Sequence, residues 1–516
     1  MKSIRKFAIN GAIMTACAIL MKTVGVAFNV YVANTVGSEA LGLYSLFYGV
    51  YGFALTLALS GLHLSVTRLI TEALALKEQA VAAKTMKKCL IFATCTGGLA
   101  LIVLTALSKP LTLYWLKDIR VLRPLRILAI CLPMAAISSV INGYFSAVRR
   151  VFKNAFTQTA EMAVKIVSTV SLFSFVFVKD AELACILLVC GSVISESASF
   201  IINIILYLTD RAYYLSPVKA RGCDMSDKKR SISRDIMHIA MPVALTSYIR
   251  SALIAVEHAL IPRGLEKFGA SGSQALSSYG TLSSMALPVI NFPYALIGPF
   301  SSLLIPEIAE SRAREEKRHI KYIAYRSFQA SIAFAICISG IFFFFSRPLG
   351  LILYGSEEAA EYIRLLAPLV PVMYTDSVTD AILKGMGEQF YAMRVNIADA
   401  FISVLLVYFL VPIYGIYGYI ATIYIAEIIN TALSVQKMIK CTSLRPPAVK
   451  FIICPLIATA GSLSFLGLLR SFFFSGKIQL AVGILAYSAI YILFLGCLGG
   501  FSKDDFIWLG KIFSRE

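Results

Sequence analysis

Two cationic residues, Lys22 and Arg250, lie near the middle of long apolar segments of the sequence. Such a charge costs roughly 2.5 to 3.5 kcal/mol at the centre of a membrane helix on insertion-based scales, so something should compensate for it. Arginine binds phosphate as a bidentate fork, and lysine binds it as a point charge. The two residues therefore predict a site for a multiply charged anion, for which a pyrophosphate is the best match. The alternative is that each cation pairs with a buried carboxylate and only joins helices.

Other charged residues follow helical spacing in segments of the same kind. Glu161 and Lys165 are four residues apart, which lets them neutralise each other. Glu257 lies seven residues after Arg250, on the same helix face and roughly 10 Å away. A further group could bind a coupling proton or sodium ion, or could neutralise Arg250. Its members are Asp376, Asp380, Lys384, Asp399 and Glu427.

The composition indicates a membrane protein. The 516 residues are 58% hydrophobic and 15% charged, with a mean hydropathy of +0.77, whereas soluble domains carry roughly 25% charged residues. The four histidines and 11 cysteines are scattered without metal-ligand spacing, and the sequence has no phosphate-binding loop of an ATPase. The net charge of +19 reflects basic loops that orient the chain in the bilayer, so nucleic acid is not expected as a partner.

Apolar runs long enough to cross a bilayer recur along the whole chain and predict fourteen transmembrane helices. Lysine and arginine are roughly three times as frequent in the loops of one side, which predicts cytoplasmic N- and C-termini. The predicted spans cover approximately residues 7–33, 40–66, 86–107, 124–147, 155–178, 182–208, 235–261, 276–304, 322–345, 360–384, 390–412, 416–438, 448–469 and 478–500.

The eighth predicted span contains two prolines, Pro288 and Pro293. Proline removes a helix hydrogen bond and kinks the helix, and several in one span predict a bent or broken helix that lines a cavity. We expect these prolines to act as a hinge; the alternative is a static kink needed for packing. Pro133 and Pro371 occupy equivalent positions in the fourth and tenth spans, where we expect architectural kinks.

Two pairs of short sequences recur in the same order. GSEALGLYS begins at Gly37 and GSQALSSYG at Gly272, an offset of 272 − 37 = 235, and LRILAICLP begins at Leu125 and IRLLAPLVP at Ile363, an offset of 363 − 125 = 238. We predict an all-α fold of two six-helix lobes with a pseudo-twofold axis along the membrane normal and the substrate path between them. The expected ranges are 1–208 and 235–440 for the lobes, 209–234 for a basic cytoplasmic linker, and 441–516 for two further helices and a cytoplasmic tail.

The 6 + 6 + 2 layout and the segment GSQALSSYGTLSSMALPVINFPYALIGPFSSLLIPEIAE resemble the multidrug/oligosaccharidyl-lipid/polysaccharide (MOP) exporter superfamily. Within it, the chain is most similar to the stage V sporulation protein B group of polysaccharide biosynthesis proteins. The resemblance implies two lobes in a V shape, alternating access, and transport of lipid-linked saccharides across the cytoplasmic membrane of a bacterium. It also implies that Lys22 and Arg250 match the cavity cations that related lipid II flippases need.

These observations favour a flippase for an undecaprenyl-pyrophosphate-linked saccharide, such as a peptidoglycan precursor or a related spore or wall unit. The expected partners are that lipid, the bilayer and cell-wall synthesis enzymes, with a coupling proton or sodium ion and no other cofactor. The nearest competitor is a cation-coupled multidrug exporter, whose first lobe should be acidic, although Glu161 and Glu196 are its only obvious mid-span carboxylates. A membrane-embedded glycosyltransferase is disfavoured by short outside loops, and a scaffold would leave Lys22 and Arg250 dispensable.

Overall fold

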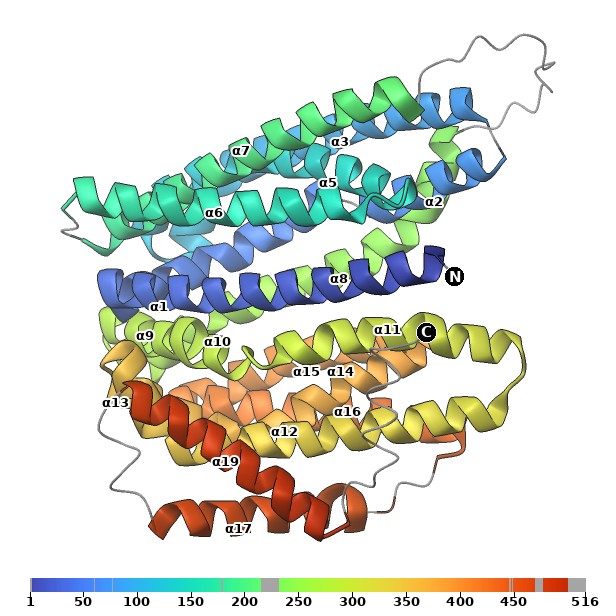
Figure 1. Cartoon of the computed structure of the whole chain (residues 1–516). Helices are drawn as coiled ribbons and strands as arrows, with labels where there is room; N and C mark the ends of the chain where they lie inside the picture. Colours follow the sequence, from blue (N-terminus) through green and yellow to red (C-terminus); the bar gives the residue numbers. More distant parts are fainter. Residues whose placement is uncertain are drawn as a thin grey trace. The chain divides into compact units, whose positions relative to one another are not determined.

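The computed structural model describes residues 2–59, 61–76, 78–177, 180–214, 232–444, 447, 449–468 and 477–499, and these residues form helices without any strand (Figure 1). The predicted linker at 209–234 and the C-terminal tail fall largely outside the described residues. The helices of the first half are α1 Lys2–Leu59, α2 Leu62–Ala75, α3 Gln79–Pro110, α4 Leu122–Ala129, α5 Cys131–Ala147, α6 Val151–Phe175 and α7 Ala181–Tyr214.

The second half repeats this order with more interruptions. Its helices are α8 Ile232–Phe268, α9 Gly272–Gly280, α10 Leu287–Ile290, α11 Tyr294–Ala313, α12 Lys317–Tyr354, α13 Glu357–Leu366, α14 Val370–Gly385, α15 Gln389–Tyr414 and α16 Ile416–Thr442. Two more, α17 Cys454–Leu468 and α19 Lys477–Cys497, follow. Short π-helical or 3₁₀ turns extend several of them: η1 Leu111–Leu116, η2 Ile119–Val121, η3 Thr281–Ala286, η4 Ala367–Leu369 and η5 Val449–Ile453.

The all-α membrane fold predicted from the sequence is confirmed. Each of the fourteen predicted spans falls on a helical segment, with the kinked α1 carrying one span and most of the next. Within the described ranges, nine helices are long and apolar enough to cross a membrane, and a bent pair makes a tenth. Helices α6, α8 and α14 are outside this set, and each carries charged side chains near its middle.

The chain divides into two compact units. We call Glu39–Leu260 the N-terminal unit, and Met1–Ser38 with Ile261–Glu516 the C-terminal unit. The first part of α1 thus groups with the second half of the chain, where Asn34 donates a hydrogen bond to the Leu353 carbonyl of α12 at 2.7 Å. These units differ from the predicted lobes in two helices. The first part of α1 belongs to the C-terminal unit, and most of α8 belongs to the N-terminal unit. The lobe boundaries stay a prediction.

The internal repeat is visible in the backbone itself. Helix α3 with η1 covers 79–116, and α12 covers 317–354, an offset of 317 − 79 = 238 at both ends. Left-handed conformations follow the same offset, because Lys117 is matched by Gly355 and Arg149 by Gly387. A positive φ is uncommon in a residue other than glycine, so Lys117 and Arg149 hold conformations that the turns of both halves require.

The eighth predicted span is broken, as its prolines predicted. The run from Gly272 to Ile290 meets α11 at an angle of 59° across residues 291–293. Pro288 lies in the first turn of α10, and Pro293 directly precedes α11. The break itself is therefore confirmed, while the hinge role of the two prolines stays a prediction.

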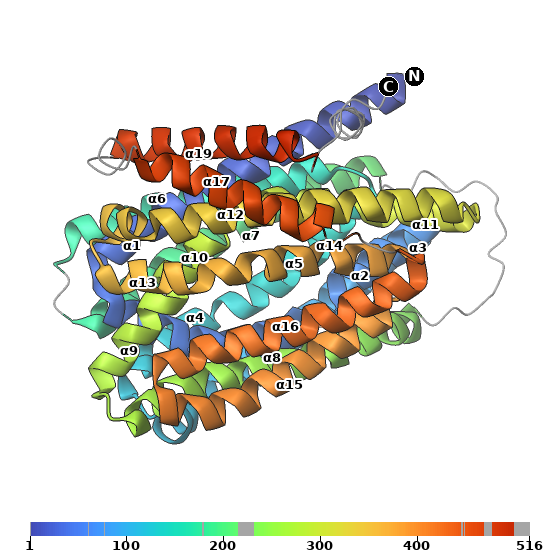
Figure 2. The ribbon, with the colours of Figure 1, turned by 90° about the horizontal axis from the view of Figure 1, so that it is seen from below.

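The two helices outside the repeat pack on α12, as both views of the ribbon show (Figures 1 and 2). The Tyr491 hydroxyl of α19 donates to the Ala333 carbonyl of α12 at 2.8 Å. The ring of Phe451 in η5 meets the ring of Tyr325 edge-on with centroids 4.9 Å apart. Helices α17 and α19 therefore belong to the core of the C-terminal unit.

Candidate functional site

Lys22 and Arg250 are both exposed in their own units, Lys22 on α1 and Arg250 on α8. Neither forms an ion pair with another residue of the described ranges. This observation counts against the alternative in which a buried carboxylate neutralises each cation. Lys22 and Arg250 are therefore charges within predicted membrane spans, without an ion-pair partner among the described residues. A charge in a membrane span is costly unless a ligand supplies the opposite charge.

The two cations lie at similar but unequal depths in their helices. Counting to the end of the first part of α1 at Val36 gives 36 − 22 = 14 for Lys22, and counting to the end of α8 at Phe268 gives 268 − 250 = 18 for Arg250. The difference of four residues is about one helical turn, or about 6 Å along a helix axis. Glu257 is half-buried on α8 and is engaged with neighbouring residues.

A first polar cluster lies inside the N-terminal unit. Glu161 and Lys165 on α6 act electrostatically on Glu196 of α7, and Lys165 and Glu196 act in turn on Tyr48 of α1. All three charged side chains are half-buried. Glu161 and Lys165 do not approach within ion-pair distance of each other among the described contacts, so they belong to one shared cluster with Glu196 and not to an isolated pair. The sequence indicated Glu196 only as a mid-span carboxylate.

A second polar cluster lies in the C-terminal unit. The Asn430 amide of α16 donates to Asp376 Oδ2 of α14 at 3.4 Å, and Lys384 Nζ lies 3.4 Å from Asp380 Oδ2 one turn further along α14. Asp380, Lys384 and Asp399 of α15 are all close enough to act electrostatically on Asp376. The sequence therefore named four residues that the fold does bring together.

Two residues of this second cluster could not be identified from the sequence. Asn430 is 6% exposed, and Ser434, one turn further along α16, is fully buried beside Asp376. Neither the Ser434 hydroxyl nor Asp376 Oδ1 completes a hydrogen bond with good geometry in the described part of the chain. Ser434 nevertheless lies close enough to Asp376 to act on it, so an amide, a hydroxyl and a carboxylate are gathered at one buried place that could take up a small cation or a proton. Glu427 is half-buried on the same helix and engaged with its neighbours.

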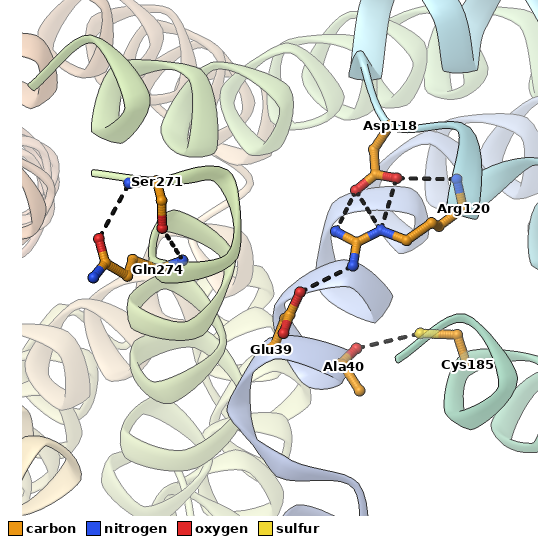
Figure 3. A network of polar contacts seen from close by, with 7 residues as sticks. All are labelled: Glu39, Ala40, Asp118, Arg120, Cys185, Ser271 and Gln274. Carbon is orange, nitrogen blue, oxygen red and sulfur yellow. Dashed lines mark hydrogen bonds and ion pairs between the residues drawn. The ribbon is translucent and has the colours of Figure 1, made fainter. Parts of the chain in front are cut away.

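Ionic contacts fix α1 where it changes unit. Gly37 is non-helical at φ 79° and ψ 171°, and two residues later Glu39 Oε1 accepts from Arg120 Nη1 at 2.9 Å (Figure 3). The Arg120 guanidinium is also held by Asp118, whose Oδ2 lies 2.8 Å from Nη2. Two carboxylates on one guanidinium favour its charged form. Arg120 therefore holds the second part of α1 against the loop before α4.

The matching point of the second half is fixed differently. The helix α9 begins with a capping box, in which the Ser271 hydroxyl accepts from the Gln274 backbone amide and the Gln274 side chain accepts from the Ser271 backbone amide (Figure 3). Such a cap satisfies amides that the first turn of a helix leaves free. The chain thus begins a new helix after Gly37 and again at Gly272, by two different local devices.

Among the residues that the structure describes, no three His, Cys, Asp or Glu side chains are grouped as metal ligands. The two polar clusters instead combine carboxylates with a lysine, an amide or hydroxyls. Such groups suit a proton, a monovalent cation or a hydroxyl-bearing ligand.

Comparison with known families gives two matches. The family described as "Polysaccharide biosynthesis protein" matches residues 7–311, and the family described as "MatE" matches residues 267–409. A curated relative, "Stage V sporulation protein B" of Bacillus subtilis (strain 168), is 27% identical over 519 residues, covering 96% of this chain and 95% of the relative.

Solved structures support the fold. "Lipid II flippase MurJ, inward closed conformation" has a TM-score of 0.70 at 14% identity, covering 95% of this chain and 99% of that one. "Inward-facing conformation of a multidrug resistance MATE family transporter of the MOP superfamily" has a TM-score of 0.65 at 13% identity, covering 84% of this chain and 99% of that one. At these identities the likeness establishes the architecture alone.

Proposed function

The chain belongs to the polysaccharide biosynthesis protein family, and we propose that it flips an undecaprenyl-pyrophosphate-linked saccharide across the cytoplasmic membrane of a bacterium. It is a multi-pass transporter of the MOP superfamily. The cargo is a peptidoglycan precursor such as lipid II, or a related wall or spore polysaccharide unit, moved by alternating access. Both termini face the cytoplasm, and cell-wall synthesis enzymes are the partners that supply or consume the cargo.

The observation that carries this proposal is the pair of exposed cations, Lys22 and Arg250, at mid-helix without an ion-pair partner among the described residues. A diphosphate supplies the negative charge that both residues lack. Charge-assisted hydrogen bonds to phosphate are short and strong, and arginine can make two at once. The match to the family described as "Polysaccharide biosynthesis protein" over residues 7–311 supports a saccharide-containing cargo, and the similarity to stage V sporulation protein B along 96% of the chain supports a role in sporulation.

The C-terminal cluster around Asp376 is proposed as the coupling site for a proton or a sodium ion. Two of its carboxylates, Asp376 and Asp380, lie with a single lysine, Lys384, among the contacts of the described residues, and Asp399 acts electrostatically on Asp376. Binding of a cation would offset that excess of negative charge inside the membrane. Movement of the ion down its gradient would then drive transport.

The second candidate is a cation-coupled multidrug exporter, which the MatE match over 267–409 favours. An exporter of cationic drugs would attract its cargo with carboxylates, so loss of Lys22 or Arg250 would leave drug transport intact or increase it. The two candidates therefore respond oppositely to the same substitutions.

The test is translocation of fluorescent lipid II, and of a diphosphate-linked saccharide unrelated to peptidoglycan, by the full chain in proteoliposomes. Lys22→Ala and Arg250→Ala should each lower the initial rate about tenfold or more, because a hydrogen bond to a charged group contributes about 1.5 to 3 kcal/mol. Lys22→Arg and Arg250→Lys should retain most of the rate. Lys84→Ala, which removes an exposed cation outside the predicted spans, is the matched control.

The outcomes separate the candidates. Transport of one lipid and its loss in both alanine variants would support the flippase and identify its cargo. Full activity of both variants would remove the anion site. A wild-type protein that flips neither lipid but expels a cationic dye would replace the flippase by the exporter.

A further inference from the structure

Three tyrosines form a ladder on the second part of α1, inside the N-terminal unit. Tyr44 and Tyr48 stack with ring centroids 5.4 Å apart and planes 22° apart, and Tyr51 continues the series 5.6 Å from Tyr48. Their spacing of four and then three residues places them on one helix face. The ladder is therefore a continuous aromatic strip along α1.

Tyr48, the middle residue of the ladder, is exposed, whereas Tyr51 is buried. Tyr48 is 45% exposed, Tyr51 is 6% exposed and Tyr44 is intermediate. Tyr51 is buried among other side chains and anchors the strip, whereas the Tyr48 ring offers an open edge and face. Stacking on Tyr44 fixes the orientation of that ring.

Charged groups lie beside the open ring. Lys165 and Glu196 are close enough to Tyr48 to act on it electrostatically, and Glu161 completes the cluster. A lipid-facing ring would not share its surroundings with three ionisable side chains. The surroundings of Tyr48 therefore include ionisable groups, which favours a hydrophilic ligand over acyl chains at the exposed part of its ring.

A flat aromatic ring beside a carboxylate and an ammonium group has the chemistry to recognise a sugar. The C–H face of a pyranose ring packs on an aromatic face, while its hydroxyls donate to carboxylates and accept from ammonium groups. Sites for small ligands combine apolar and aromatic walls with a few placed polar groups in this way. A diphosphate would be repelled by Glu161 and Glu196, and a lipid tail would leave all three charges unsatisfied.

The equivalent positions of the second half do not repeat this arrangement. At the offset of 235 between the repeated segments, Tyr44 corresponds to Tyr279, but Tyr48 corresponds to Ser283 and Tyr51 to Ala286. Tyr279 is fully buried. Because the fold does not demand a tyrosine at these positions in both copies, the ladder is a local feature of the N-terminal unit and not a requirement of the architecture.

We propose that Tyr48, oriented by Tyr44 and flanked by Glu196 and Lys165, is a saccharide subsite that stacks one pyranose ring of the lipid-linked cargo. This inference rests on the proposed flippase function and assigns the sugar part of the cargo to the N-terminal unit. The subsite recognises the saccharide, and the cations Lys22 and Arg250 bind the diphosphate.

The test compares two lipids that share the undecaprenyl diphosphate, of which only lipid II carries the disaccharide with its peptide. Binding of lipid II and of undecaprenyl pyrophosphate is measured on the full chain in nanodiscs, for wild type and for Tyr48→Leu, Tyr48→Phe and Glu196→Gln. Tyr48→Leu keeps the bulk but loses the flat ring, and should weaken lipid II binding about threefold to tenfold. Undecaprenyl pyrophosphate binding should not change. Tyr48→Phe should bind both lipids as wild type does, and Glu196→Gln should weaken only lipid II.

The controls are Tyr114→Leu, which removes another exposed tyrosine, and Lys22→Ala, which should weaken both lipids equally. If Tyr48→Leu weakens both lipids equally, or neither, the subsite is refuted while the flippase proposal stands. If wild type binds neither lipid better than a neutral phospholipid, the flippase proposal fails, and the subsite fails with it. The same comparison with a second diphosphate-linked saccharide shows which sugar the subsite prefers.

Discussion

The two halves of the chain repeat the same helices but carry different polar side chains at matching positions. At the offset of 238 found for the backbone, three consecutive turns of α5 and α14 show the exchange most clearly. The positions are Ser138, Asn142 and Ser146 on α5, and Asp376, Asp380 and Lys384 on α14. The neutral set of the first half is thus replaced by a charged set in the second, on helices of matching boundaries.

The next helices show the opposite trend. Glu161 of α6 is matched by Asp399 of α15, so a carboxylate is kept, but Lys165 is replaced by Ser403. The C-terminal unit therefore gathers carboxylates around Asp376, whereas the N-terminal unit combines two glutamates with a lysine and an exposed tyrosine. The difference teaches that the two copies share a framework but differ in their charged side chains, and the proposed cation site and saccharide subsite rest on that difference.

The largest effect is expected from putting the residue of one half into the other. Asp376→Ser introduces the side chain found at the matching position 138 and removes the central carboxylate of its cluster. We expect the stimulation of transport by an imposed sodium or proton gradient to fall about tenfold or more, because a charged ligand is lost. The measurement is the flipping rate in proteoliposomes with each gradient imposed separately.

The matched control is Ser138→Ala, whose hydroxyl is buried without a hydrogen-bond partner in the described residues. It should leave gradient-driven transport unchanged. An Asp376→Ser protein with full gradient dependence would show that the charge difference between the halves does not concern coupling.

A second contrast concerns ion pairs of opposite polarity at matching loops. Arg150 precedes α6 and pairs with Asp210 at 2.7 Å, with Lys153 also 2.9 Å from Asp210. At the same place before α15, the acidic Glu388 pairs with Lys437 at 3.1 Å. The loop before α6 is thus joined to the last turns of α7, and the loop before α15 to the last turns of α16. The loop residue is basic in the first case and acidic in the second.

The two ties should differ in their contribution to stability. The Asp210 side chain is 5% exposed, so Asp210→Asn leaves two cations without their buried partner and should lower the free energy of unfolding by about 3 kcal/mol. Glu388 is 37% exposed, and Glu388→Gln should cost less than about 1 kcal/mol. Thermal unfolding of both variants in the same detergent measures the difference. Equal losses would mean that burial does not distinguish the pairs.

The sequence could predict the framework because bilayer thickness sets the length of each apolar run, and prolines marked the break at 291–293. The kink at Gly37 lies in the gap between the first two predicted spans, but the sequence could not show that only this one residue departs from helical geometry within α1. Asn430 and Ser434 were missed because neutral polar residues in a membrane helix carry no signal until a neighbouring helix places Asp376 beside them. The grouping of the first helices into units depends on packing, which periodicity does not encode.

A third contrast concerns the outer faces of α12 and α3. Gly340 lies against α19, where an added Cβ would collide with the Tyr487 hydroxyl and lie 2.9 Å from Thr459. Its counterpart on α3, Ile102, is 65% exposed. Gly340→Ala should therefore lower the free energy of unfolding by about 2 kcal/mol through overpacking, whereas Ile102→Ala should have little effect. Tyr487→Phe should recover part of the loss in the double variant, and no recovery would place the collision elsewhere.

The smallest difference in stability is expected between substitutions of Gly37 and Gly272, the glycines that begin the two repeated segments. Gly37 holds φ 79° and ψ 171°, a region almost restricted to glycine, while Gly272 starts a capped helix without a positive φ. Gly37→Ala should cost about 1 to 2 kcal/mol of unfolding free energy, and Gly272→Ala less than about 1 kcal/mol. Chemical or thermal unfolding of both variants gives the comparison. If Gly37→Ala were as stable as wild type, the glycine conformation would not be needed where α1 passes from one unit to the other. The local structures at Gly37 and at Gly272 would then contribute equally to stability.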